Sequence, residues 1–368
     1  MNTILVTRRC INCLVAALLL MNLQVSALAS IIRDTELESG IQKLMAPLIT
    51  AAGYSPNAIA IRIIIDPDYN AFVAGKQIIY LHSGLLLKAQ STEEIIGVLA
   101  HEIGHLKAGH VPRRDTAIAD LNSASALAAL AAVAVAAGGG GDSAAGVLIG
   151  GQDQATKNLL QTIRYDEAVA DEIGLALLDK SGISASGLRD LMQRMASQRA
   201  LPESRQSRYY RTHPDASVRF GVYRDHVDRK DRKTKPLSRD VIALANRLKA
   251  KIRAYVEPSQ SVLALFNDEV MPEHLYARSI ALYRQGALEQ ALAINDRLIE
   301  MSPDDAFFYE FRGDILLSMA KPRESALAYE IAIALRPNSP QILLNYGRAL
   351  IASGKKSSLS KAILVLEK

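Results

Sequence analysis

Two histidines and a glutamate stand close together in the segment His-Glu-Ile-Gly-His at residues 101–105. Residues four apart lie on one helix face about one turn apart, so His101 and His105 can each offer a ring nitrogen to a single metal ion. Glu102 follows the first histidine, where its carboxylate can act as general base toward an attacking water. The spacing predicts a metal-dependent hydrolytic site; the alternative is a histidine pair satisfied by packing.

The residues around this motif predict the helix that such a site requires. Ser91 and Glu94 form a capping box, with Ser91 as the N-cap and Glu94 as its reciprocal partner. Gly109 and Pro112 predict the end of the helix. Between these limits, apolar residues recur at helical spacing and form one buried stripe, which consists of Ile95, Ile96, Leu99, Ile103 and Leu106.

A second helix is predicted to supply the third metal ligand. Glu167 and Asp171 are four residues apart and share one helix face. Glu167 would complete a set of two histidines and one glutamate, which leaves the fourth position of a catalytic zinc for water. Asp171 is placed to accept a hydrogen bond from a ligand imidazole and to fix its tautomer. The alternative is a pair of solvated carboxylates on an amphipathic helix, whose predicted buried residues are Val169, Ile173, Leu175 and Leu177.

Residues 1–29 have the pattern of a cleaved secretory signal peptide. Arg8 and Arg9 precede an apolar run over residues 11–20, and Ala-Leu-Ala at residues 27–29 gives a small-x-small cleavage site. A retained membrane anchor is the alternative, and polar residues interrupt the apolar run before the roughly 20 residues that a span needs.

Composition indicates an exported protein of about two domains. The chain has 368 residues, and its two cysteines, Cys10 and Cys13, both lie in the predicted leader. A mature protein without thiols would need nitrogen and oxygen ligands for zinc, and export without disulfides fits a bacterial periplasm. The formal net charge is +5, with much of the basic density in residues 224–235. Acidic residues alternate there, so we expect a solvated linker, no nucleic-acid partner and at most peripheral membrane contact.

A small sheet is predicted ahead of the histidine helix. The isoleucine-rich residues 58–65 indicate a strand, and residues 71–74 and 77–81 flank Gly75 as a hairpin. Such a strand beside a zinc helix either pairs with an extended peptide through backbone hydrogen bonds or only covers the core. The sequence leaves both possibilities open.

Residues 116–151 are rich in alanine and glycine and are predicted to form two small-residue helices joined by a flexible turn. Their place between the two ligand-bearing helices suggests a lid or plug over the cleft. A flexible surface insertion is the alternative, and the short, weakly apolar alanine run argues against a membrane span.

Residues 274–368 repeat with a period of 34 residues. Pro303 and Pro337 are one period apart, and so are Gly313 and Gly347. A proline that closes each unit and small residues at helix crossings are typical of tetratricopeptide repeats, with ordinary helical hairpins as the alternative. The same step relates two further sets of positions, which are Ser279 to Gly313, and Gly286 to Ala320 to Gly354.

The motifs in their order resemble the CAAX-prenyl-protease-like zinc metallopeptidases. The matching segments are residues 101–105, Glu167-x-x-Ala170-Asp171 and Thr212-His213-Pro214. Residues 70–72 and 81–86 also resemble the strand segment before the zinc helix of that family. With a signal peptide in front and repeats behind, the resemblance is to the group of periplasmic β-barrel assembly-enhancing proteases, over about residues 31–368.

The resemblance implies one zinc ion per chain, with His101, His105 and Glu167 as ligands and Glu102 as catalytic base. His213 matches a histidine that approaches the metal in such proteins, where it fills the fourth position in a resting state or stabilises the oxyanion when substrate is bound. Arg219 matches a basic position that follows the same motif. The family also implies quality control of outer-membrane β-barrel proteins, with the repeats contacting the assembly machinery.

The predicted fold is α+β and mainly helical: a zincin-like metalloprotease domain with a small β-sheet at residues 30–256, then a tetratricopeptide-repeat domain at residues 257–368. The predicted function is a periplasmic zinc endopeptidase that degrades misassembled envelope or outer-membrane proteins. A chaperone or assembly scaffold with a silent or regulatory site is the alternative. A prenyl-protein protease is disfavoured because that enzyme needs several membrane spans. The remaining histidines are predicted to be structural or solvated, and they are His82, His110, His226 and His274.

Overall fold

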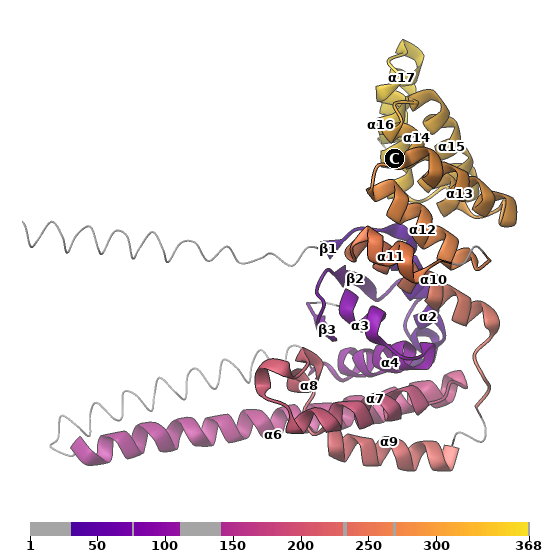
Figure 1. The fold of residues 1–368 in the computed structure, drawn as a ribbon. Helices are drawn as coiled ribbons and strands as arrows, with labels where there is room; N and C mark the ends of the chain where they lie inside the picture. Colours follow the sequence, from indigo (N-terminus) through magenta and orange to yellow (C-terminus); the bar gives the residue numbers. More distant parts are fainter. Residues whose placement is uncertain (1–30, 76, 111–140, 231–233, 268–269, 367–368) are drawn as a thin grey trace, which may run out of the picture.

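The computed structural model describes most of the chain, in the ranges 31–75, 77–110, 141–230, 234–267 and 270–366. The predicted signal peptide and residues 116–140 of the predicted lid lie outside these ranges. The predicted α+β, mainly helical class is confirmed: one small sheet is followed by helices that end in a repeat stack (Figure 1). No helix within the described ranges is both long and apolar enough to cross a membrane.

The sheet has four strands in the order β1-β2-β4-β3. β2 and β4 are parallel, and the edge strands β1 and β3 are antiparallel to their neighbours. The predicted strand at residues 58–65 and the predicted hairpin are therefore confirmed. The strands are β1 (Ile31–Ile32), β2 (Ala60–Ile64), β3 (Ala71–Ala74) and β4 (Ile78–His82).

Helices pack against the sheet and make up most of the first domain. Figure 1 shows α4 between the sheet and the long α6, with α7 and α9 on the far side of α4 from the sheet. One hydrophobic cluster includes residues of α2, the strands, α4, α6 and α7. The helices up to this point are α2 (Thr35–Ala52), α3 (Ser83–Lys88), α4 (Thr92–Ala108), α6 (Gly141–Ser181), α7 (Ser186–Ser197), α8 (Arg208–Thr212) and α9 (Ala216–Lys230), with short 3₁₀ turns at Gln198–Ala200 and Glu203–Arg205.

The helix that carries the histidine motif begins and ends as predicted. The Ser91 hydroxyl accepts a hydrogen bond from the Glu94 N–H at 3.1 Å. Gly109 ends α4 in the left-handed conformation with φ 68°, and its N–H donates to the His105 carbonyl. One detail of the predicted capping box is wrong, because Glu94 accepts from the N–H of Gln90 at 3.0 Å and not from that of Ser91. Pro112 lies outside the described residues.

Two predicted boundaries differ from the structure. Residues 141–151, predicted to belong to the insert, form the first turns of α6, which runs without a break through Glu167 to Ser181 over 41 residues. The predicted charged linker at residues 224–235 begins as the last turns of α9. The glycines near residue 141 and the dense charges after residue 224 suggested breaks, but the alanines and most of the charged residues in these stretches favour helix, and the helices continue.

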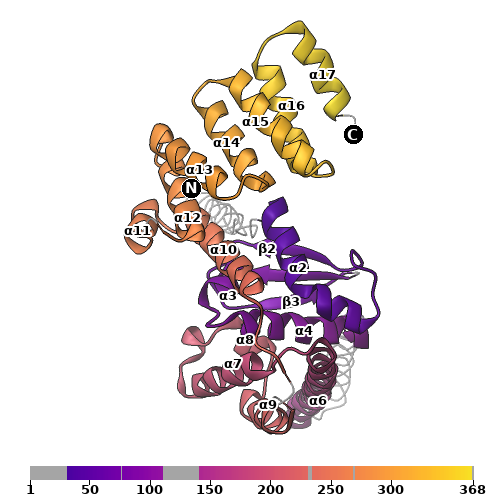
Figure 2. The ribbon, with the colours of Figure 1, turned by 90° about the vertical axis from the view of Figure 1, so that its right-hand side faces the viewer.

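The repeats follow the predicted 34-residue period. Gly286, Ala320 and Gly354 each directly follow the C-cap residue of a helix and adopt the left-handed conformation, with φ 80°, 57° and 68°. The predicted tetratricopeptide array is thereby confirmed as paired helices stacked in sequence (Figure 2). The helices that follow α9 are α10 (Arg239–Val256), α11 (Ser259–Leu265), α12 (Pro272–Arg284), α13 (Leu288–Met301), α14 (Ala306–Ser318), α15 (Pro322–Leu335), α16 (Pro340–Ala352) and α17 (Lys356–Leu366).

In two successive repeats, a serine hydroxyl donates a hydrogen bond from one helix of the repeat to the other. The serine lies on the first helix in one repeat and on the second helix in the next. Ser279 on α12 donates to the Ala291 carbonyl on α13 at 2.7 Å. One period later, Ser325 on α15 donates to the Gly313 carbonyl on α14 at 2.8 Å. The replacement of Ala291 by Ser325 one period on therefore preserves the cross-helix bond, because the serine has moved from the first helix to the second.

A buried ion cluster joins the first domain to the repeats. The Glu36 carboxylate at the start of α2 accepts hydrogen bonds from Arg247 Nε at 2.5 Å and from Lys251 Nζ at 2.7 Å. Tyr276 OH on α12 donates to the same carboxylate at 2.8 Å, and Arg247 also pairs with Asp305. Burial favours the protonated acid, but the two cations hold the pKa of Glu36 below its usual value. The helix α10 thus connects both parts of the molecule.

The buried Glu310 of α14 is expected to make the stability of the repeats depend on pH. Burial raises the pKa of this carboxyl to about 8 against the opposing charge of Lys251, from the usual 4.5. Because the pKa is raised in the folded state, the contribution of this carboxyl to stability is full below about pH 4.5. It is lost as the pH rises from there through about 8. We expect Glu310→Gln to remove this loss and to exceed the wild type in stability by roughly a few kcal/mol at alkaline pH.

Denaturant unfolding on both sides of this pH window measures the effect. Glu324→Gln, at an exposed glutamate of α15, is the matched control and should leave the pH profile unchanged. A Glu310→Gln profile that follows the wild type at every pH contradicts the prediction.

Candidate metal centre

The two helices that carry the candidate ligands cross at glycines. A Cβ on Gly104 of α4 would lie only 2.4 Å from the Ala170 carbonyl oxygen on α6. A Cβ on Gly174 of α6 would lie 3.3 Å from the Ala100 carbonyl on α4. The missing side chains let the two backbones approach closely, which brings one ligand-bearing face against the other.

The Gly104→Val substitution should therefore separate the helices. The atom in the way is a backbone oxygen, so α6 must move, and we expect roughly 1–3 kcal/mol of destabilisation together with loss of metal binding. Gly221→Val is the control, since a Cβ on that α9 residue meets no atom of the described residues within 4 Å. Thermal unfolding and metal content of the two variants test this, and a metal-replete Gly104→Val protein would contradict it.

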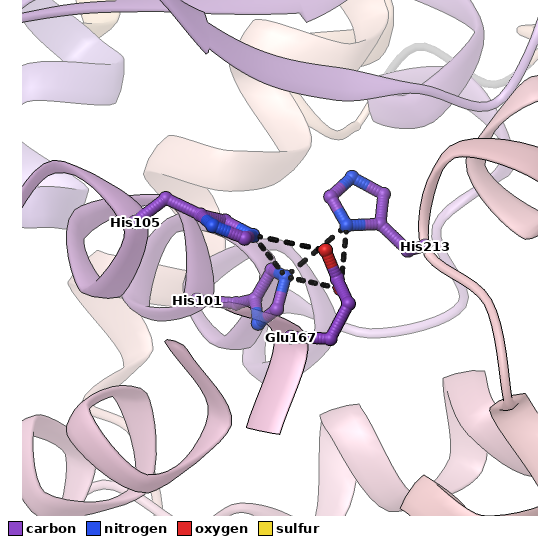
Figure 3. Close-up of side chains that lie close together, drawn as sticks. All are labelled: His101, His105, Glu167 and His213. Atoms are coloured by element: carbon purple, nitrogen blue, oxygen red, sulfur yellow. Dashed lines mark hydrogen bonds and ion pairs between the residues drawn. The ribbon is translucent and has the colours of Figure 1, made fainter. Parts of the chain in front are cut away.

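Four buried side chains converge where α4, α6 and the end of α8 meet (Figure 3). The Nε2 atoms of His101 and His105 are 3.0 Å apart. One oxygen of Glu167 lies 3.3 Å from His101 Nε2 and the other lies 3.4 Å from His105 Nε2. His213 Nδ1 is 2.9 Å from Glu167 Oε2 and 3.3 Å from His101 Nε2. The structure thus brings the predicted ligand residues together, with His213 as a fourth member.

This donor set fits a metal ion. One donor atom from each of the four residues lies within 4.8 Å of all the others, and all four residues are buried. Two imidazole nitrogens 3.0 Å apart repel through their lone pairs unless a proton or a cation lies between them. Neutral imidazoles and a carboxylate are ligands of divalent transition metals. The arrangement can therefore hold one such ion.

Asp171 and Arg219 form a buried ion pair next to the cluster. Asp171 Oδ1 lies 2.8 Å from His101 Nδ1, as expected for a carboxylate that orients this imidazole. Arg219 donates from Nε and Nη2 to the two Asp171 oxygens, both at 2.7 Å, and from Nη1 to Glu167 at 2.9 Å. Tyr223, which the sequence analysis missed, donates its hydroxyl to Asp171 from the same face of α9 as Arg219.

These contacts shift the pKa values of the buried groups. Burial favours protonated Asp171, but Arg219 and the His101 hydrogen bond hold the pKa of Asp171 below its usual range. Burial and the Arg219 charge oppose protonation of His101, yet its hydrogen bonds to Asp171 and Glu167 raise its pKa to about 9. Burial and the neighbouring His101 lower the pKa of His105 well below the ordinary value. Burial also opposes ionisation of Glu167, but the charge of His213 and the hydrogen bonds from the three histidines hold its pKa well below the ordinary value. Both carboxylates are therefore ionised and can face a cation.

Glu102 lies beside the donor group and is fully buried. Its Oε1 is 3.7 Å from His213 Nε2, on the side of that ring opposite the Nδ1 atom that faces Glu167. The predicted base thus neighbours the cluster without belonging to the group of donors.

The position of His213 is fixed by the short helix α8. Ser207 caps this helix by accepting a hydrogen bond from the Tyr210 N–H at 3.2 Å, and the His213 N–H donates to the Tyr209 carbonyl at 2.8 Å. The rings of Tyr209 and His213 pack with their centroids 4.3 Å apart. His213 Nε2 also lies 3.5 Å from the Ala71 carbonyl oxygen of the edge strand β3. One imidazole therefore touches both the donor cluster and the sheet edge.

His110 occupies a place that the sequence analysis did not foresee. It is fully buried, and its Nδ1 lies 2.8 Å from the Nδ1 of His105. Its spacing of five residues from His105 is not a ligand spacing, and only the turn at Gly109 brings it back against the cluster. The other three histidines lie apart: His82 pairs with Asp66, His226 with Asp179, and His274 packs on Phe266.

Comparison with known proteins identifies the family. A sequence model of peptidase family M48 matches residues 32–226, more than half of the chain, and a tetratricopeptide-repeat model matches residues 260–306 and 312–358. The chain belongs to peptidase family M48. M48 peptidases are metal-dependent, which agrees with the donor group on α4, α6 and α8.

Three curated relatives match half or more of this M48 chain. The β-barrel assembly-enhancing protease of Yersinia pestis is 22% identical over 347 residues, which cover 92% of this chain and 70% of the relative. The protein of the same name from Escherichia coli K12 is 23% identical, over 90% of this chain and 68% of its own length. The metalloprotease LoiP of Escherichia coli K12 is 28% identical over 50% of this chain and 70% of its own length.

Proposed function

We propose that this M48 chain is a zinc-dependent endopeptidase of the periplasm that degrades misassembled envelope or outer-membrane proteins. The observation that carries the proposal is the convergence of two imidazoles and a carboxylate beside a separate buried glutamate. A site that only held a metal for structural reasons would have no use for Glu102. Three protein ligands plus an exchangeable fourth position are what a catalytic zinc requires.

In this proposal, His101, His105 and Glu167 hold zinc, and Asp171 keeps the His101 ring in the orientation that directs Nε2 inward. When bound, the metal supplies a Lewis acid that polarises the peptide carbonyl and lowers the pKa of water. The Glu102 carboxylate takes a proton from the attacking water and later returns it to the leaving amine. Arg219 offsets the negative charge of two of the buried carboxylates, Glu167 and Asp171.

His213 is proposed to occupy the fourth position in the resting enzyme. Its Nδ1 lies among the donors, 3.3 Å from His101 Nε2, so an incoming substrate must displace the ring. Once displaced, the imidazole can donate a hydrogen bond to the developing oxyanion, because it starts next to Glu102 and the edge of β3. The two roles that the sequence leaves open then become two states of one residue.

The edge strand β3 is the proposed binding site for the substrate backbone. It pairs with β4 on one side, and no strand within the described residues pairs with its other side. An extended peptide can add there by backbone hydrogen bonds. Ala71 of β3 contacts His213, so a peptide on this edge would run past the metal centre. Such binding favours unfolded segments, in which the backbone is available.

The periplasmic location and the partners rest on the predicted signal peptide and on the relatives. Two of these are named β-barrel assembly-enhancing proteases, and each matches this chain through both the peptidase domain and the repeats. The repeats are proposed to bind protein substrates or the outer-membrane β-barrel assembly machinery, since stacked helical repeats form extended surfaces for protein contacts.

A second function is favoured by the closed state of the site. Because His213 lies among the donors, the resting chain can also act as a chaperone or assembly scaffold in which the site is silent or regulatory. The two functions differ in whether protein cleavage depends on the metal.

The test is metal-dependent cleavage by the purified protein. Zinc-loaded protein should cleave an unfolded protein such as casein, treatment with 1,10-phenanthroline should stop the cleavage, and added zinc should restore it. Metal analysis should find one zinc ion per chain. A zinc-loaded protein that leaves unfolded substrates intact, yet prevents their aggregation, would support the scaffold function and contradict the peptidase.

A further inference from the structure

We propose that His110 and Asp166 are positioning residues for the metal ligand His105. They form a buried chain, Asp166 to His110 to His105, that fixes the tautomer and the ring orientation of this ligand. The inference rests on the proposed metal-binding function and adds two residues that the catalytic proposal does not use.

The contacts that carry the inference lie on the side of His105 away from the donor cluster. His105 Nε2 faces His101 and Glu167, and its Nδ1 lies 2.8 Å from His110 Nδ1. On the far side of the His110 ring, Nε2 lies 3.5 Å from Asp166 Oδ1. His110 is 1% exposed and Asp166 is 0% exposed, so both groups are shielded from water.

Two neighbouring elements supply this pair. Gly109 turns the chain through the left-handed region directly after α4, which returns the His110 ring to 5.0 Å from that of His105, centroid to centroid. Asp166 directly precedes Glu167 on α6. The helix that offers a carboxylate to the metal site therefore offers its neighbouring carboxylate to the ring behind the site.

The proton positions follow from the ligand role of His105. A neutral imidazole that binds a metal through Nε2 carries its proton on Nδ1. The 2.8 Å contact between the two Nδ1 atoms needs one donor and one acceptor, so His110 Nδ1 must be the acceptor. His110 then carries its own proton on Nε2, which lies 3.5 Å from the Asp166 carboxylate. The negative charge of Asp166 at this distance favours an N–H on His110 Nε2 electrostatically, and the short Nδ1–Nδ1 contact passes this preference on to His105.

The two ligand histidines are therefore oriented in different ways. His101 has a carboxylate directly behind it, with Asp171 Oδ1 at 2.8 Å from Nδ1. His105 has a neutral imidazole behind it, with the carboxylate one ring further away. Partners that orient a ligand in this way commonly account for about 10–100-fold in metal affinity.

Three substitutions separate positioning from general packing. His110→Leu removes the acceptor and should lower zinc affinity about 10–100-fold. His110→Asn places an amide oxygen near the position of Nδ1 and should retain most of the affinity. Asp166→Asn can present an N–H to His110, which favours the wrong tautomer and sets two N–H groups against each other. We expect its zinc affinity to fall about as far as that of His110→Leu.

The chain contains a matched control in a second histidine that is buried and paired with a carboxylate. His82 is 1% exposed, and its Nδ1 lies 3.3 Å from Asp66 Oδ2. His82→Leu should lower thermal stability without changing zinc affinity.

The measurement is zinc competition against a chromophoric chelator, with the full chain at fixed pH, beside the absorption spectrum of the cobalt-substituted protein. Equal zinc affinity in wild type, His110→Leu and Asp166→Asn would overturn the inference. So would a loss in His110→Asn as large as that in His110→Leu, or a matching loss in His82→Leu. If His110→Leu does not fold, the contrast between His110→Asn and Asp166→Asn decides.

This outcome is distinct from failure of the proposed function. A wild-type protein that binds no zinc removes the basis of both proposals. A wild-type protein that binds zinc and cleaves protein, with unchanged zinc affinity in the variants, overturns only the role of His110 and Asp166.

Discussion

Glu102→Gln is expected to abolish proteolysis and to leave the fold and the bound zinc intact. The residue is fully buried beside the four donors but is not one of them, so its substitution removes no ligand. The amide of glutamine has nearly the same shape as the carboxylate but cannot accept the proton of water. General base catalysis is worth about 10²–10⁴ in rate, and we expect a loss of at least about 10³-fold.

The measurement combines cleavage of an unfolded protein with metal analysis of the same sample. Glu93→Gln is the matched control because it makes the same chemical change on the first turn of the same helix. The control should retain zinc and activity. Full activity in Glu102→Gln would show that another group acts as base, whereas loss of zinc from that variant would show that the residue supports the metal site itself.

The sequence predicts most of the site because the information is local. The N-cap Ser91 and the C-cap Gly109 bound the histidine helix within one residue of the predicted limits, and the spacing of His101 and His105 then fixes their common face. The repeats are equally predictable, since a 34-residue period in small residues reports helix crossings that recur along the chain. In both cases, residues close in sequence determine the geometry.

Other parts of the site depend on contacts between residues that are distant in sequence. His110 lies beyond the end of α4, as predicted, but no periodicity indicates that a left-handed Gly109 returns it to His105. The ion cluster joins Glu36 to residues more than 200 positions later in the chain, such as Arg247 and Tyr276. No local pattern indicates such contacts. Tyr223 could have been found, since it lies four residues after Arg219 on one helix face.

The length of α6 was mispredicted for a different reason. Clusters of glycine and alanine near residues 138–151 suggested a turn and an independent insert, yet the described part of this stretch continues into the ligand helix. Helix propensity is a weak guide at such places, because alanine favours helix and glycine opposes it, and the tertiary context decides.

Arg219→Met is expected to cause the largest loss of stability in the site. Arg219 is 4% exposed, and its guanidinium donates to both Asp171 oxygens and to Glu167. Its removal leaves two buried carboxylates without their cation, which typically costs about 3–5 kcal/mol. Arg219→Lys should not restore this stability, because a single ammonium cannot match the planar fork that spans the two carboxylates.

Denaturant unfolding of chelator-treated protein isolates this effect from the contribution of zinc. Arg224→Met is the control, because this arginine lies on the same helix and pairs with Asp225 at 3.0 Å, with both side chains more than half exposed. An exposed pair contributes about 0–1 kcal/mol, so the control should remain close to wild type. Equal stabilities of Arg219→Met and Arg224→Met would mean that the histidines alone neutralise the buried carboxylates, and Arg219 would then lose its assigned part in holding Glu167 and Asp171 beside the metal.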